Sequence, residues 1–131
     1  MNSETGTDAP NDLTTSVHEL RALVRRFVEV RDWSQFHAPK NISMALAIEA
    51  AELMEHFQWI EVEASRRTAD DQAKRTAVGE ELADVVCYAL ALANEMDIDV
   101  SAAMHAKMKK NERKYPAAEY RGRYGPEDRP S

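Results

Sequence analysis

The chain of 131 residues has little of what holds small secreted or membrane proteins in shape. A single cysteine, Cys87, excludes a disulfide within the chain and a zinc site built on several cysteines. No apolar run is long enough to cross a membrane, and residues 1–11 lack the basic and apolar regions of a signal peptide. We therefore expect a cytoplasmic protein with no membrane partner. Because Cys87 stands in an apolar run, we expect its thiol to be buried and inert.

Strand patterns are also missing, because no stretch alternates apolar and polar residues between turns. Apolar residues instead recur every three or four positions, which is the spacing of amphipathic helices. The sequence predicts an all-α fold of the four-helix-bundle type, with Asn41 and Asp99 as N-caps. The helices are expected near 13–28, 41–60, 73–96 and 99–113.

The third predicted helix is apolar on nearly all sides, so we expect other helices to surround it. On the fourth, we expect Val100, Ala103, Met104 and Met108 to point inward. A monomer this small would leave apolar surface uncovered, which predicts at least a dimer. Along the chain we expect a disordered tail, one folded domain and a flexible tail, at 1–12, 13–116 and 117–131.

Charge of one sign is concentrated in a single segment. The chain has 17 basic and 23 acidic residues and a formal net charge of −6. Residues 49–84 contain ten acids and four bases, so this segment carries the whole excess of six, and the rest of the chain is neutral. The overall balance lacks the basic footprint of a protein that binds duplex nucleic acid, and we expect no such partner.

Two pairs of acids lie in the most apolar predicted helices. Glu49 and Glu52 form one pair, and Glu81 and Asp84 form the other. A spacing of three residues puts both carboxylates on one side of a helix. Four carboxylates in a bundle core would repel one another and lose hydration, and a divalent cation relieves both costs. All-oxygen ligands suit Mg²⁺ or Mn²⁺, although a solvated acidic face remains the alternative.

A di-iron carboxylate centre is the natural rival in a four-helix bundle. Such a centre needs a Glu-x-x-His motif on two helices. None of the histidines has a glutamate three residues before it, and the sequence therefore disfavours this centre. The histidines are His18, His37, His56 and His105.

Aromatic side chains stand at helical spacing from these acids. Trp59 follows Glu52 by seven residues, and Tyr88 follows Asp84 by four. The preceding connection adds a further pair four residues apart, Trp33 and His37. Aromatics beside a metal-carboxylate cluster suggest a planar base held over its phosphates, with plain core packing as the alternative.

The fourth predicted helix supplies cations. From Lys107 to the end the chain has eight bases and four acids. Lys107, Asn111, Lys114 and Tyr115 follow one another in steps of four, three and one. They could contact phosphate, or they could form a basic helix end that complements the helix dipole.

Together these segments resemble the MazG-like, all-α nucleoside triphosphate pyrophosphohydrolases, and within them the dCTP pyrophosphatase branch. The resemblance covers about residues 15–116. The matching segments are Arg31–His37, Glu49–Leu53, Phe57–Trp59, Glu81–Val85 with Tyr88, Lys107–Asn111 and Lys114–Pro116.

The resemblance implies a role for each matching residue. It implies Mg²⁺ ligands at Glu49, Glu52, Glu81 and Asp84, with Glu49 or Glu52 also activating the attacking water. It implies base and sugar contacts for Trp33, His37 and Trp59, and a substrate contact near the metal for Tyr88. It implies phosphate contacts for Lys107, Asn111 and Tyr115.

The resemblance also implies a reaction. Such enzymes cleave between the α- and β-phosphates, here dCTP to dCMP and pyrophosphate, as house-cleaning of the nucleotide pool. They are homotetramers, dimers of dimers, whose sites combine residues of several subunits. Val24 stands where animal relatives have a histidine that contacts substrate, which leaves base preference open. The alternatives are the same chemistry on a broader or modified nucleotide set, and a non-catalytic helical oligomerisation module.

Overall fold

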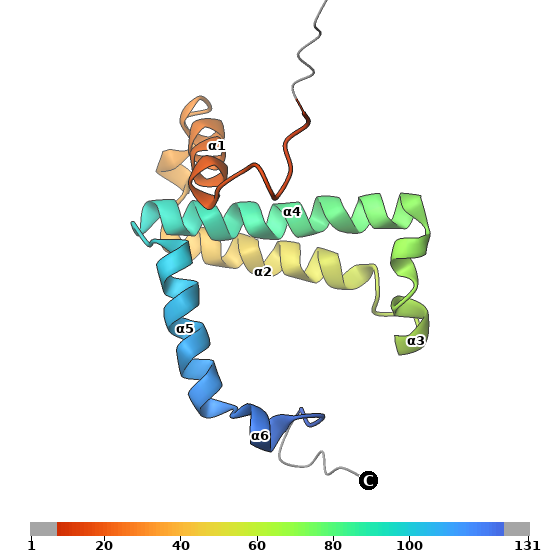
Figure 1. The fold of residues 1–131 in the computed structure, drawn as a ribbon. Coiled ribbons are helices and arrows are strands. Elements are labelled where there is room, and N and C mark those ends of the chain that lie inside the picture. Colours follow the sequence, from red (N-terminus) through yellow and green to blue (C-terminus); the bar gives the residue numbers. More distant parts are fainter. Residues whose placement is uncertain (1–7, 125–131) are drawn as a thin grey trace, which may run out of the picture. The chain divides into compact units, whose positions relative to one another are not determined.

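The computed structural model describes residues 8–124, and every regular element among them is helical (Figure 1). The prediction of an all-α fold is confirmed. The predicted tails fall partly outside the described residues, which exclude 1–7 and 125–131. The described residues form two compact units, one that ends at Asp97 and one that begins at Ile98.

The first unit contains three long helices and shorter turns. The bounds of its elements are α1 Val17–Glu29, η1 Ser34–Phe36, α2 Pro39–Glu55, α3 Val62–Ser65, η2 Thr68–Asp70 and α4 Gln72–Glu95.

Capping residues explain where α1 begins. Ser16 Oγ accepts a hydrogen bond from the Glu19 amide, and the Glu19 carboxylate accepts one from the Ser16 amide, both at 3.1 Å. This reciprocal capping box satisfies two amides that a helix start would leave unpaired. The predicted start at Leu13 is therefore wrong, and Leu13 lies outside the helix.

The bounds of α2 also differ from the prediction. The helix begins at Pro39, whose fixed φ and missing amide hydrogen suit a first helical position. Asn41 is not the N-cap, because it lies two residues inside the helix and the N-cap is Ala38. The Asn41 side-chain amide donates to the Phe36 carbonyl at 3.2 Å. The helix ends at Glu55 rather than Ile60. By contrast, α4 lies within one residue of its predicted bounds and is capped by Asp71.

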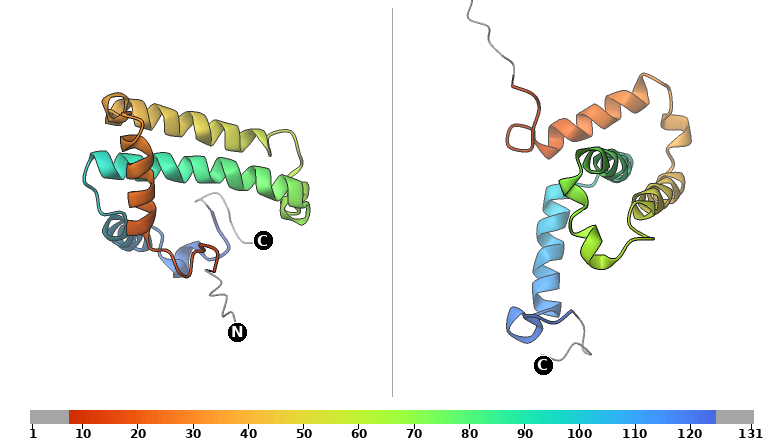
Figure 2. Two further views of the ribbon diagram at one scale, coloured as in Figure 1. Left: turned by 90° about the horizontal axis from the view of Figure 1, so that it is seen from above. Right: turned by 90° about the vertical axis from the view of Figure 1, so that its right-hand side faces the viewer.

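Helices α2 and α4 lie side by side and run antiparallel, forming a hairpin (Figures 1 and 2). Helix α1 crosses α4 at one end of this hairpin, and α3 lies at the other end. Asn94 fastens α1 to α4: its side-chain oxygen accepts from Arg21 Nε and Arg25 Nη2, and its amide donates to the Arg21 carbonyl, all at 3.1 Å. These bonds of Arg21 and Arg25 thus fix the position of α1 on α4.

The core of this unit is small. The buried apolar residues are Val28, Ile42, Leu90, Ala91 and Ala93. The expectation that helices surround residues 73–96 is wrong within one chain, since α4 leaves Leu82 and Val86 exposed. On α2, Met44 and Ile48 are exposed as well.

The second unit contains α5 (Val100–Lys114) and the short α6 (Ala117–Tyr120). Asp99 caps α5 as predicted, accepting from the Ala102 amide at 2.8 Å. The predicted inward positions Met104 and Met108 are exposed, and no residue of α5 is buried.

The first residues of the predicted tail form the short helix α6. Tyr115 and Tyr120 meet edge to face with ring centroids 5.2 Å apart, which holds α6 against the end of α5. Among the described residues, no helix combines the length and apolarity that crossing a bilayer requires.

Candidate active site and metal centre

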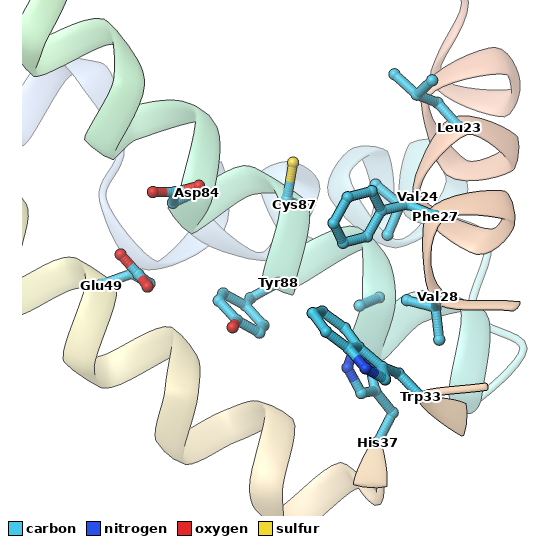
Figure 3. Close-up of a pocket in the computed structure, with 11 residues that line it drawn as sticks. Leu23, Val24, Phe27, Val28, Trp33, His37, Glu49, Asp84, Cys87 and Tyr88 are labelled. Atoms are coloured by element: carbon cyan, nitrogen blue, oxygen red, sulfur yellow. The ribbon is translucent and has the colours of Figure 1, made fainter. Parts of the chain in front are cut away.

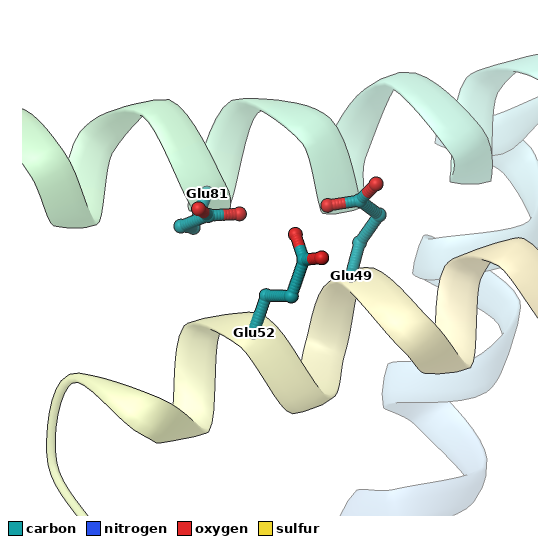
Figure 4. Close-up of side chains that lie close together, drawn as sticks. All are labelled: Glu49, Glu52 and Glu81. Atoms are coloured by element: carbon teal, nitrogen blue, oxygen red, sulfur yellow. The ribbon is translucent and has the colours of Figure 1, made fainter.

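Carboxylates from both helices of the hairpin converge between them. Glu49 and Glu52 project from α2 and Glu81 from α4, and Figure 4 shows the three pointing toward one another. One carboxylate oxygen from each lies within 4.8 Å of the other two, so the group could hold a metal ion. The three-residue spacing on α2 and the antiparallel pairing with α4 are what bring these oxygens together.

Asp84, the predicted fourth ligand, lies next to this group rather than inside it. It lines the neighbouring cavity together with Glu49. The charge of Asp84 raises the pKa of both Glu49 and Glu81, although other causes raise each pKa more. Asp84 is thus within electrostatic range of the three glutamates, and its role as a ligand stays a prediction.

The electrostatics of the cluster reflect its crowding. The pKa of Glu49 is raised from 4.5 to about 7, first because the Glu52 carboxyl lies close enough to share a proton with it. Burial and the surrounding negative charges raise the pKa of Glu49 further. Burial, followed by the charge of Glu52, raises the pKa of Glu81.

The donor set fits a hard divalent cation. Oε2 of Glu49 and Oε2 of Glu81 are buried and have no hydrogen-bond partner among the described residues. A buried carboxylate oxygen without a donor is costly, and a cation would satisfy both atoms and offset the repulsion. Because all the donors are carboxylate oxygens, the cluster suits Mg²⁺ or Mn²⁺ better than zinc.

An apolar cavity of about 560 Å³ opens beside the carboxylates (Figure 3). Trp33, His37 and Tyr88 line it, and the substrate contacts expected of them stay predictions. Glu49 and Asp84 form its polar end. Its volume lies within the usual range for small-molecule sites, which are mostly apolar with a few polar groups.

Helix α1 supplies a wall of this cavity, of which sequence analysis singled out only Val24. Leu23, Phe27 and Val28 line it along with Val24. Phe27 meets Trp33 edge to face with centroids 5.7 Å apart. The apolar stripe of the first helix was visible in the sequence, but an apolar stripe indicates a core as readily as a pocket.

Cys87 also lines the cavity, and the expectation of a buried thiol is wrong. One side of the apolar run around Cys87 faces the space between α4 and α1 rather than a closed core. Partial burial and the neighbouring Asp84 raise the pKa of the Cys87 thiol, which favours the less reactive protonated form.

The remaining predicted site residues lie elsewhere. Because α2 ends at Glu55, Trp59 is not on the stripe of Glu52; it is 87% exposed and lines no part of the cavity. Lys107, Asn111 and Tyr115 belong to the second unit, on α5 and at its end. The substrate contacts expected of these four residues stay predictions.

A family model described as MazG-like matches residues 44–124. The chain belongs to the MazG-like family. This MazG-like chain is similar to "dCTP pyrophosphatase 1" of Bos taurus, with 39% identity over 107 residues that make up 82% of the chain and 63% of the relative. The Homo sapiens protein of the same name is 39% identical over 102 residues, 78% of the chain and 60% of the relative. The chain thus spans under two thirds of these relatives' length.

A solved structure agrees with this placement. The crystal structure of a pyrophosphatase from Archaeoglobus fulgidus aligns with a TM-score of 0.71 and 36% sequence identity. The alignment covers 82% of the MazG-like chain and 99% of the archaeal one. The family resemblance and the all-α fold predicted from sequence are therefore confirmed.

The raised pKa of Glu49 predicts how the metal-free protein responds to pH. The folded state holds a proton on Glu49 that the unfolded state releases, and this proton stabilises the folded state. The stabilisation is complete below about pH 4.5 and is lost as the pH rises through about 7. In EDTA, we expect the free energy of unfolding of the wild type to fall over this pH interval, with a steepest slope against pH that corresponds to about one bound proton. Glu49→Gln should lack this fall. Urea unfolding at a series of pH values measures it.

Glu55→Gln is the matched control, because Glu55 ends the same helix and is exposed. It should keep the wild-type pH dependence. Identical slopes for the wild type and Glu49→Gln would contradict the electrostatic account of the cluster.

Proposed function

We propose that the chain is a Mg²⁺-dependent nucleoside triphosphate pyrophosphohydrolase that cleaves between the α- and β-phosphates, with dCTP as substrate. The observation that carries the proposal is the convergence of three carboxylates from α2 and α4 beside an aromatic-lined cavity. The name that the mammalian relatives carry, "dCTP pyrophosphatase 1", supports the substrate. The archaeal pyrophosphatase supports the reaction.

In the proposed reaction, the carboxylates would hold the cation, and one of them would activate the attacking water. Glu49, Glu52, Glu81 and Asp84 would hold Mg²⁺, which when bound neutralises phosphate oxygens and polarises the reacting phosphorus. Glu49 or Glu52 would orient a water molecule and accept its proton as that water attacks the α-phosphorus.

The cavity would bind the nucleoside. Trp33 and Tyr88 offer ring faces and edges to a planar base, and His37 offers a polar contact. Val24 supplies methyl groups where a histidine would supply a hydrogen bond. Because Val24 lines the cavity, this position contributes to base selectivity.

The chain would act as a homo-oligomer, a tetramer built as a dimer of dimers. The exposed side chains Met44, Ile48, Leu82 and Val86 lie on the two helices that carry the carboxylates. Apolar surface of this extent on a small protein is typical of an interface. Trp59, which is exposed in one chain, would then contact substrate held by a neighbouring subunit.

A panel of nucleoside triphosphates tests the activity. We expect dCTP with Mg²⁺ to yield dCMP and pyrophosphate, identified by chromatography. Glu52→Ala and Asp84→Ala should lower kcat/KM at least about 100-fold, because each removes a metal ligand or the group that activates water. Circular dichroism should show both variants folded, and Glu55→Ala should stay within about twofold of wild type.

The same panel separates the alternatives. A strong preference for dUTP, dATP or a methylated cytosine nucleotide would contradict the dCTP assignment and favour the broader enzyme. If no nucleotide is cleaved with Mg²⁺ or Mn²⁺, and the alanine variants only stabilise the fold, the non-catalytic oligomerisation module is correct.

Light scattering tests the assembly. We expect a mass about four times the 14.8 kDa of one chain at micromolar concentration. Ile48→Asp should shift the protein toward smaller species, because a charge in an apolar interface is costly. Leu13→Asp, which changes a still more exposed apolar side chain outside the helices, should not. A monomeric wild type would overturn the proposed oligomer.

A further inference from the structure

A second cavity, of about 380 Å³, lies in the part of the first unit where α2 leads through α3 and η2 into α4. Its polar lining consists of His56, Arg67, Thr68, Asp71 and Lys74. Arg67 and Lys74 are permanent cations at neutral pH, and a single carboxylate, that of Asp71, faces them. The cavity is therefore cationic, in contrast to the acidic cluster near it.

The one carboxylate in this lining is already engaged. Asp71 Oδ1 accepts hydrogen bonds from the Ala73 amide at 3.0 Å and the Lys74 amide at 3.2 Å, as the N-cap of α4. The Arg67 and Lys74 side chains make no ion pair or hydrogen bond with another residue in the range 8–124. The neighbouring Arg66, by contrast, pairs with Glu63 at 3.2 Å. The charges of Arg67 and Lys74 are thus available to a ligand.

Helical spacing places this cationic cavity next to the carboxylates. His56, the C-cap of α2, follows Glu52 by four residues, about one helical turn. Lys74 precedes Glu81 by seven residues on α4, about two turns or 10 Å. His56 lies close enough to Glu81 for its charge to lower the pKa of that carboxyl, against the stronger influences that raise it.

The hairpin therefore presents three sites in a row. The aromatic cavity comes first, at the end of the hairpin where α1 crosses (Figures 1 and 3). The carboxylate cluster follows (Figure 4), and the cationic cavity lies at the end that carries α3. A nucleoside triphosphate has the same order of chemical groups: a planar base, the α-phosphate at which cleavage occurs, and two further phosphates.

We propose that the cationic cavity binds the β- and γ-phosphates of the substrate, the group that leaves as pyrophosphate, through Arg67 and Lys74. The proposal rests on the proposed function for the identity of the substrate. The arginine guanidinium matches two phosphate oxygens at once, and the lysine ammonium supplies a compact charge. Occupation of this cavity would favour triphosphates over monophosphates, because a monophosphate does not reach it from the carboxylates.

Charge-removing variants with matched neighbours test this assignment. Arg67→Gln and Lys74→Gln remove the cations of the cavity, and Arg66→Gln and Arg75→Gln remove cations one residue away that do not line it. Binding of inorganic pyrophosphate in the presence of Mg²⁺ is measured by calorimetry, and KM and kcat are measured for dCTP. Melting temperatures of all four variants check that they remain folded.

We expect Arg67→Gln and Lys74→Gln each to raise the pyrophosphate Kd and the KM for dCTP about tenfold, with kcat changed less than about threefold. The two neighbouring variants should stay within about twofold of wild type. Equal weakening in all four variants would show general electrostatic attraction and overturn the assignment.

Two further outcomes separate this proposal from the proposed function. If the wild type cleaves dCTP but Arg67→Gln and Lys74→Gln bind pyrophosphate and dCTP as the controls do, the cavity assignment alone is overturned. If the wild type cleaves no nucleoside triphosphate, the proposed function is overturned, and the assignment of the cavity to substrate phosphates is overturned with it.

Discussion

The interaction on which the rest of the structure depends is the enforced proximity of carboxylates between α2 and α4. Pairing of the two helices brings Glu49, Glu52 and Glu81 within 4.8 Å of one another and leaves buried oxygens without donors. Repulsion of this kind has to be relieved by a proton or by a cation. At low pH a shared proton relieves it, as the raised pKa of Glu49 shows, and at neutral pH a divalent cation would.

The small core follows from the same arrangement. Residues at the centre of the α2–α4 hairpin, which in a simple bundle would be apolar, are carboxylates and cavity walls. Hydrogen bonds between helices, such as those of Asn94 with Arg21 and Arg25, hold α1 on α4 in the absence of a large buried core. The apolar surface left on α2 and α4 fits the proposed oligomer, in which neighbouring copies complete the packing.

Sequence reasoning predicted what depends on local spacing. The placement of Glu49 and Glu52 on one side of α2, the long helix of residues 72–95 and the cap at Asp99 all follow from periodicity or from capping preferences within a few residues. It failed where competing local contacts decide the outcome, as at Ser16, which starts α1, and at Glu55, where α2 ends before reaching Trp59. Apart from Val24, it also missed the cavity wall on α1, and it missed the exposure of Cys87, since an apolar pattern does not reveal whether the opposite side is filled.

The central claim is that the carboxylate cluster is a cation site, and thermal unfolding at pH 8 tests it most directly. Wild type and Glu52→Gln, which keeps the side-chain shape and removes one charge, are compared in EDTA and in Mg²⁺ at equal ionic strength. A ligand that binds only the folded state raises its melting temperature. The account predicts that Mg²⁺ raises the wild-type melting temperature by several degrees, whereas Glu52→Gln melts higher than wild type in EDTA and gains little from Mg²⁺. An unchanged wild-type melting temperature, or an equal gain in both proteins, would contradict it.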